Sequence, residues 1–168
     1  MSISYYENNK RKIPSTLIPK LCTLFNCTSD ELLGIEKENI IKIYGKIPAG
    51  IPFEMITDII GMEEIDIEML KGGKKYFGLQ VSGDSMFPTY LDKDILICEQ
   101  TNDTESGKDC IVTINGNDAT FKKIIKKENG VVLQPINPNY EPMFYTNDEI
   151  EKLPIRIIGV VREIRRKI

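Results

Sequence analysis

The residues best suited to chemistry in this 168-residue chain lie in the stretch Val-Ser-Gly-Asp-Ser-Met-Phe-Pro-Thr at 81–89. An apolar run ends at Gly83, Ser85 follows in a turn, and Pro88 prevents a long helix from continuing. A serine hydroxyl at a strand end, with free backbone N–H groups beside it, suits a nucleophile and an oxyanion site. The same composition is also typical of an ordinary turn, so both interpretations stay open at this point.

A serine nucleophile needs a base, and the chain contains no histidine. This excludes Ser-His-Asp triads, Cys-His dyads and histidine-containing metal sites. Lys122 stands in Ala-Thr-Phe-Lys-Lys, where strand alternation puts it on one face with Thr120 and Ile124. It is either an exposed lysine on an edge strand or a buried, neutral lysine that acts as the general base. Lowering its pKa from about 10.4 to about 7 requires roughly 4–5 kcal/mol, which burial can supply.

The segments that would position these residues are strands. Stretches rich in Val, Ile, Phe and Tyr recur from Lys75 onward, and Asn115-Gly116 between two of them is typical of a hairpin turn. We therefore expect a mainly β fold, with a compact antiparallel domain at 76–168. The expected strands are Tyr76–Val81, Asp94–Cys98, Asp109–Ile114, Ala119–Ile125, Val131–Gln134 and Ile155–Ile164.

A small α-helical segment at 1–34 precedes this domain. Apolar residues recur at helical spacing over Leu17–Phe25, and Thr28 with Glu31 then matches a capping box, followed by Gly34 as a stop. Helices this short cannot bury a core alone.

Residues 35–75 are expected to form a connector. Ile40–Tyr44 is a strand candidate, whereas Pro48 and Pro52 hold the following stretch extended and prevent a helix.

Composition narrows the class of protein. Hydrophobic residues make up 41% and charged residues 28%, no apolar run is long enough to span a membrane, and no secretion signal opens the sequence. The net charge of −3 argues against a protein that mainly coats nucleic acid. We expect no metal, no cofactor and a reducing, cytoplasmic setting, because the cysteines lack disulfide or zinc spacing: Cys22, Cys27, Cys98 and Cys110.

The motif around Ser85, followed at a characteristic interval by Lys122, resembles the LexA-type self-cleaving repressors and their mutagenesis-protein relatives of the UmuD kind. The Ala49-Gly50 bond precedes the serine at the interval where that family places its self-cleavage site. Lys93 departs from the pattern, because the family usually has glycine in that turn. The resemblance covers the chain from about residue 40 onward.

This resemblance implies a serine peptidase with a Ser-Lys dyad. By carry-over, Ser85 attacks the carbonyl of Ala49, Lys122 is the base, and the backbone N–H groups of Asp84 and Ser85 stabilise the oxyanion. Small residues at Ala49-Gly50 allow the backbone to approach the serine closely, and flanking prolines reduce the entropy lost on docking.

Residues 1–34 resemble the second half of a Cro-type helix-turn-helix domain, which implies that the first residues belong to the recognition helix. The two scaffold helices of that family have no counterpart, so we expect an incomplete DNA-binding segment. The basic residues of the turn that follows the recognition helix are explained equally well as solvent-exposed side chains that do not contact DNA. The residues that the resemblance assigns to DNA contact are Ser2, Ser4, Tyr5, Asn8, Lys10 and Arg11.

Together these features predict a LexA-like or prophage-type transcriptional repressor that inactivates itself by cleavage at Ala49-Gly50. In the family, the β domain also forms a homodimer, to which the strand Ile155–Ile164 is a candidate contributor. The RecA–single-stranded DNA filament of the SOS response stabilises the cleavable conformer there, and operator DNA is the partner of full-length relatives.

Three alternatives remain at the level of sequence. A UmuD-like accessory factor would use the same chemistry and bind a translesion polymerase. A signal-peptidase relative would share the Ser-Lys pair but need a membrane anchor. The third alternative is a catalytically inactive dimerisation and regulatory module.

Overall fold

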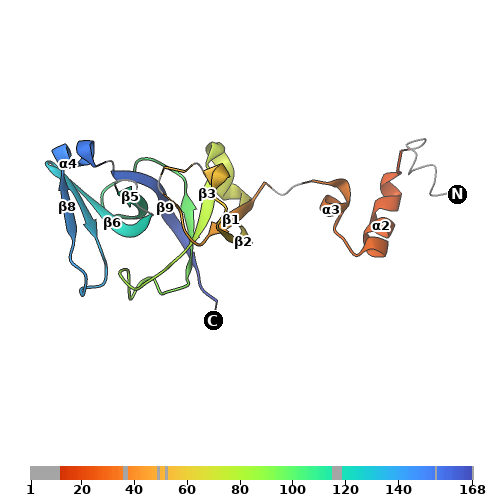
Figure 1. Ribbon diagram of the computed structural model, residues 1–168. Coiled ribbons are helices and arrows are strands. Elements are labelled where there is room, and N and C mark those ends of the chain that lie inside the picture. The colour runs from red at the N-terminus through yellow and green to blue at the C-terminus, as the bar shows by residue number, and fades with distance from the viewer. Residues whose placement is uncertain are drawn as a thin grey trace. The chain divides into compact units, whose positions relative to one another are not determined.

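The computed structural model describes residues 12–35, 38–48, 50–51, 53–114, 119–153 and 155–167. The chain divides into two compact units, Met1–Glu38 and Asn39–Ile168 (Figure 1). Several predicted features lie outside the described residues: the hairpin turn at Asn115-Gly116, the cleavage-site residue Ala49, and the DNA-contact residues Ser2, Ser4, Tyr5, Asn8, Lys10 and Arg11.

The first unit contains a 3-10 turn, η1 (Ser15–Leu17), and the helices α2 (Ile18–Phe25) and α3 (Ser29–Leu33). The predicted capping box is confirmed: the Glu31 N–H donates to Thr28 Oγ1 at 3.2 Å, and the Thr28 N–H donates to Glu31 Oε2 at 2.8 Å. None of its described residues is buried, as expected for helices this short.

In the described part of the second unit, nine strands form one sheet in the order β2-β1-β3-β4-β9-β5-β6-β7-β8. All neighbours are antiparallel except β1 and β3, which are parallel. The mainly β prediction is therefore confirmed. The strands are β1 (Ile40–Tyr44), β2 (Ile59–Glu64), β3 (Tyr76–Gln80), β4 (Ile95–Glu99), β5 (Lys108–Ile114), β6 (Thr120–Lys127), β7 (Gly130–Gln134), β8 (Met143–Thr146) and β9 (Ile155–Arg165), accompanied by η2 (Phe53–Met55), η3 (Ile67–Gly73) and α4 (Asn147–Lys152).

The six strands predicted in the C-terminal part and the candidate Ile40–Tyr44 are all present, whereas β2 and β8 were missed. β2 reads Ile-Ile-Gly-Met-Glu-Glu, and its glycine and glutamates are depleted in strands. β8 has only four residues and follows a proline. Both lie at the edges of the sheet, where burial constrains the sequence least.

The long strand β9 joins two groups of strands. Its first half pairs with β5, from Ile155 to Val160, and its second half pairs with β4, from Val160 to Arg165. The register shifts on both sides, between Ile111 and Val112 on β5 and between Ile97 and Cys98 on β4. β9 is therefore the strand that pairs with both the β1–β4 group and the β5–β8 group (Figure 1).

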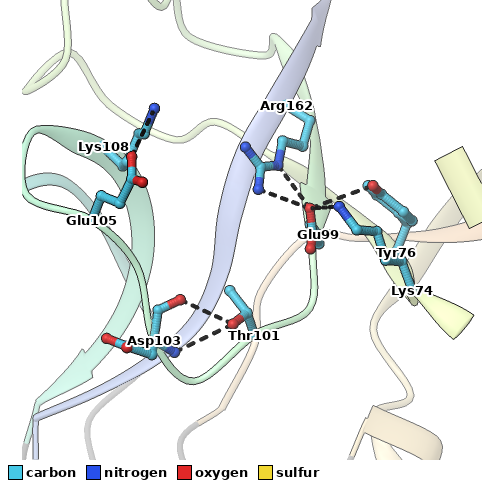
Figure 2. Close-up of polar contacts among 8 residues, drawn as sticks. All are labelled: Lys74, Tyr76, Glu99, Thr101, Asp103, Glu105, Lys108 and Arg162. Atoms are coloured by element: carbon cyan, nitrogen blue, oxygen red, sulfur yellow. Dashed lines mark hydrogen bonds and ion pairs between the residues drawn. The ribbon is translucent and has the colours of Figure 1, made fainter. Parts of the chain in front are cut away.

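A charged cluster around Glu99 fastens β9 to β4 (Figure 2). The Glu99 carboxylate accepts hydrogen bonds from Arg162 Nε at 2.9 Å and from Lys74 Nζ at 3.2 Å, and Tyr76 reaches it from β3. Burial acts to raise the pKa of Glu99, but the hydrogen bonds from Lys74 and Arg162 outweigh it and hold the pKa below its usual range. Because Glu99 lies on β4 and Arg162 on β9, the ion pair fixes the relative position of these two strands.

Gly159 on β9 lies against the ring of Phe77 from β3, which leaves no room for a side chain at this position. A Cβ built there would lie 2.7 Å from the Phe77 ring and 3.1 Å from the Glu99 carbonyl oxygen. We predict that Gly159→Ala lowers the free energy of unfolding by about 1–3 kcal/mol, measured by urea denaturation. Gly61→Ala in β2 is the matched control, because its Cβ would meet Ile43 at an ordinary 3.5 Å. Equal stability of the two variants would contradict this account of the close contact at Gly159.

Candidate active site

Ser85 lies in a tight turn that follows β3. Gly83 has φ +90°, a conformation that glycine adopts without strain, and its N–H donates to Asp92 Oδ1 at 3.0 Å. The Phe87 N–H donates to the Asp84 carbonyl at 3.0 Å and closes the turn around the serine. The turn predicted from Gly-Asp-Ser is therefore present.

The base of this loop is a short hydrogen-bonded ladder. The Val81 N–H donates to the Asp94 carbonyl at 2.8 Å, and the Lys93 N–H donates to the Val81 carbonyl at 2.9 Å. Lys93 has φ +70°, the left-handed region that costs a non-glycine residue about 1–2 kcal/mol. This geometry explains why a glycine suits the turn in which the sequence has Lys93.

Lys122 lies near the start of β6 and is only 9% exposed. Its Nζ lies 2.9 Å from Ser85 Oγ, 2.9 Å from the Phe121 carbonyl oxygen and 3.3 Å from Thr120 Oγ1. Of the two interpretations of this lysine, the structure favours the buried one, and it brings Lys122 into direct contact with Ser85.

Among the described residues, the partners of the Lys122 amine are neutral groups, and burial lowers its pKa. The neighbouring Lys123 points to the other face, where it forms a 2.9 Å ion pair with Asp109. Neighbouring residues of a strand point to opposite faces, so the Asp109 carboxylate pairs with Lys123 and does not stabilise the charged form of Lys122.

A neutral lysine amine has two N–H groups and one lone pair. When the N–H groups are donated to Thr120 Oγ1 and to the Phe121 carbonyl, the lone pair is available to the Ser85 hydroxyl at hydrogen-bond distance. This arrangement can remove the serine proton as the oxygen attacks an electrophile.

The predicted oxyanion groups lie in the same turn. Within the described part of the chain, the backbone N–H groups of Asp84 and Ser85 donate no hydrogen bond. Unpaired donors beside a serine oxygen are what a developing negative charge requires.

A cleft of about 170 Å³ lies beside these groups, and Gly45, Lys46 and Ile47, from the segment before the predicted cleavage site, form part of its wall. Ile47 is 3% exposed in this cleft, and its carbonyl accepts a hydrogen bond from the Ala119 N–H at 2.9 Å. Sequence reasoning missed this contact. Of the two predicted cleavage-site residues, Gly50 has φ +77°, whereas Ala49 lies outside the described residues.

The end of the chain also holds the serine loop. Arg166, just after β9, donates to both carboxylate oxygens of Asp94, at 2.7 and 2.6 Å, and the Leu91 N–H donates to the same group at 2.8 Å. The hydrogen bonds from Arg166 are the main reason that the pKa of Asp94 is lowered although it is buried. The sequence shows that the last strand is basic, but it does not predict that Arg166 pairs with Asp94.

A mainly β domain with a serine hydroxyl against a buried lysine amine is a peptidase-type domain. The Peptidase S24-like family model matches residues 42–162, and the chain belongs to that family. The sequence-based expectation of a LexA-like peptidase relative is confirmed.

Curated relatives carry the name LexA repressor. The chain is 38% identical to the LexA repressor of Clostridium perfringens (strain SM101 / Type A) over 134 residues, which cover 79% of this chain and 64% of the relative. It is 31% identical to the LexA repressor of Bacillus velezensis over 138 residues, 80% of this chain and 66% of the relative. The chain therefore spans slightly less than two-thirds of either relative.

Two further findings concern the described residues alone. No helix among them is long and apolar enough to cross a membrane, and no group of three or more His, Cys, Asp or Glu side chains is placed to hold a metal ion.

The Asp94–Arg166 pair leads to a pH-dependent prediction. The folded-state pKa of Asp94 is lowered, so the stability that this carboxylate contributes is present above its unfolded pKa of about 3.9 and is lost as pH falls through the folded value. Arg166→Gln should lower the urea midpoint at pH 7 and at pH 4, and the difference from wild type should shrink as the pH falls further below about 4.

Arg165→Gln is the neighbouring control, because Arg165 pairs with the more exposed Glu63. It should change the pH 7 midpoint less than Arg166→Gln does. A loss for Arg166→Gln that does not shrink at all below pH 4 would show that the carboxylate charge is not responsible.

Proposed function

We propose that this chain is a LexA-like regulator that inactivates itself by cutting its own Ala49-Gly50 bond, with Ser85 as nucleophile and Lys122 as base. The observation that carries the proposal is the 2.9 Å contact between Ser85 Oγ and a buried lysine amine whose partners in the described part of the chain are neutral. A lysine in this environment can be deprotonated at moderately alkaline pH, which an exposed lysine cannot.

The reaction begins as Lys122 takes the Ser85 proton while Oγ forms a bond to the Ala49 carbonyl carbon. The carbonyl oxygen becomes negatively charged and accepts hydrogen bonds from the N–H groups of Asp84 and Ser85. The lysine then returns the proton to the Gly50 nitrogen as the peptide bond breaks, which leaves an ester between Ser85 and Ala49.

Water completes the cycle. The Lys122 amine takes a proton from water as the hydroxyl oxygen attacks the ester carbonyl, and returns it to Ser85 Oγ as the ester breaks. The products are a new carboxylate at Ala49 and a new amine at Gly50.

The docked position of Ile47 supports a substrate within the same chain. The Ala119 N–H, just before β6, donates to the Ile47 carbonyl, so the loop lies beside the start of β6 as an extended peptide lies beside the edge of a sheet. In the sequence, only Pro48 separates Ile47 from Ala49, the first residue of the proposed scissile bond. Because the substrate is tethered, proximity replaces a binding step.

The regulatory part of the proposal follows the relatives, which are LexA repressors. It includes a homodimer in the cytoplasm, operator DNA as the partner of the full-length protein, and a RecA–single-stranded DNA filament that stabilises the cleavable conformer. Such an activator shifts a population and supplies no catalytic group. Cleavage would break the covalent link between a DNA-contacting segment and the β domain.

The lowered pKa of Lys122 predicts self-cleavage that depends on pH. The rate of fragment formation should rise about tenfold per pH unit below the lysine pKa and level off above it, because the neutral amine is the active form. Intact mass after incubation from pH 7 to 10 measures the rate and places the cut.

Ser85→Ala and Lys122→Met are the controls, and each should slow cleavage roughly 1000-fold or more while leaving the circular dichroism spectrum unchanged. An intact wild-type chain at every pH would favour the non-catalytic dimerisation module. Cleavage that persists in Ser85→Ala would assign the cut to another agent.

The buried position of Ile47 leads to a second prediction on the loop. Ile47→Ala removes most of the buried side chain that holds this segment against the wall of the cleft, so self-cleavage at pH 9 should slow about tenfold or more. Ile51→Ala makes the same change on an exposed residue of the same loop and should slow cleavage much less. If both variants cleave at the wild-type rate, Ile47 does not dock the substrate.

A further inference from the structure

The segment that leaves β7 makes direct contact with the Ser85 turn. The backbone N–H groups of Ile136 and Asn137 both donate to the Ser85 carbonyl, at 3.1 and 3.0 Å. Lys122 lies on β6, the strand paired with β7, so the base and this segment reach the serine from neighbouring strands.

The Asn137 side chain contacts the residue before the serine. Its Nδ2 donates to the Asp84 carbonyl at 3.0 Å and lies 3.4 Å from Asp84 Oδ2. Its Oδ1 accepts a hydrogen bond from the Asn139 N–H at 3.0 Å, which fixes the orientation of the amide. Asn137 is 4% exposed, so water does not compete for these contacts.

The geometry of the peptide bond gives the contact a consequence for catalysis. In a trans peptide the C=O and N–H groups point in opposite directions in one plane. The Asp84 carbonyl and the Ser85 N–H belong to the same peptide, so a donor that holds the carbonyl also sets the direction of the N–H. The Asp84 carbonyl accepts from two donors, Asn137 Nδ2 and the Phe87 N–H.

Tyr140 contacts the side chain of Asp84, whereas the shorter contact of Asn137 is with the Asp84 carbonyl. Its hydroxyl donates to Asp84 Oδ1, and this hydrogen bond raises the pKa of Tyr140. Asp84 is thus held through both its carbonyl and its carboxylate by residues of one short segment.

We propose that Asn137, together with Tyr140, is a positioning residue that fixes the Asp84–Ser85 peptide so that the Ser85 N–H faces the oxyanion. This inference rests on the proposed self-cleavage and deepens it. Among the described residues, Asn137 forms its hydrogen bonds with the serine turn and its own segment and none with Lys122, so it acts through the turn.

The test is the pH profile of self-cleavage for Asn137→Ala. Loss of the side-chain amide should leave the Ser85 N–H less well oriented and lower the plateau rate about 10- to 100-fold. Because both residues are neutral, the pH midpoint should stay where Lys122 sets it. Asn139→Ala is the matched control, because it makes the same change at an exposed position of the same segment and keeps the backbone N–H that Asn137 uses. It should cleave at the wild-type rate.

A folded Asn137→Ala variant that cleaves at the wild-type rate would overturn the inference, as would a shifted midpoint with an unchanged plateau. If Asn137→Ala does not fold, Tyr140→Phe decides instead: a plateau lowered several-fold supports the inference, and a wild-type profile overturns it. Failure of the wild-type chain to cleave at any pH would refute the proposed self-cleavage rather than the role of Asn137.

Discussion

The burial of one lysine amine, which has no carboxylate partner among the residues that the structure describes, is the constraint on which the rest of this structure depends. Removing an ammonium group from water is costly, so the fold must keep Lys122 neutral or surround it with acceptors. It provides the Ser85 oxygen, the Thr120 oxygen and the Phe121 carbonyl. The same environment that makes the charged form unfavourable makes the neutral amine available as a base. Stability and reactivity therefore make opposite demands on a single side chain.

The Ser85–Lys122 contact spans the two groups of strands that β9 joins. The serine follows β3 in one group, and the lysine lies on β6 in the other, so a 2.9 Å distance between them depends on how the groups are aligned. Contacts along the second half of β9 and just beyond it maintain that alignment. Arg162 pairs with Glu99 on β4, and Arg166 pairs with the buried Asp94 at the base of the serine loop. The far end of the chain thus contributes to the site without touching the reacting atoms.

The sequence allowed prediction of what local patterns encode. The Thr28 capping box and most strands follow from spacing alone, and the pairing of Ser85 with Lys122 was expected from motifs and a family resemblance. The missed features are non-local. Asn137 lies 53 positions from Asp84, and Arg166 lies 72 positions from Asp94, so each contact depends on sheet order rather than on any repeat in the sequence. Helix α4 is a different case, because the capping box of Thr146 and Glu149 was visible in the sequence but overlooked.

The position of β1 gives the proposed cut an unexpected product. β1 precedes Ala49, yet it is paired on both sides, with β2 and β3, and buries Ile41, Ile43 and Tyr44. Hydrolysis at Ala49-Gly50 would therefore yield a nicked complex in which the N-terminal product keeps its strand within the sheet of the other product. The two pieces would part only when β1 is pulled out, so the off-rate of one strand, rather than the chemical step, would set how long a cut molecule continues to behave as an intact one.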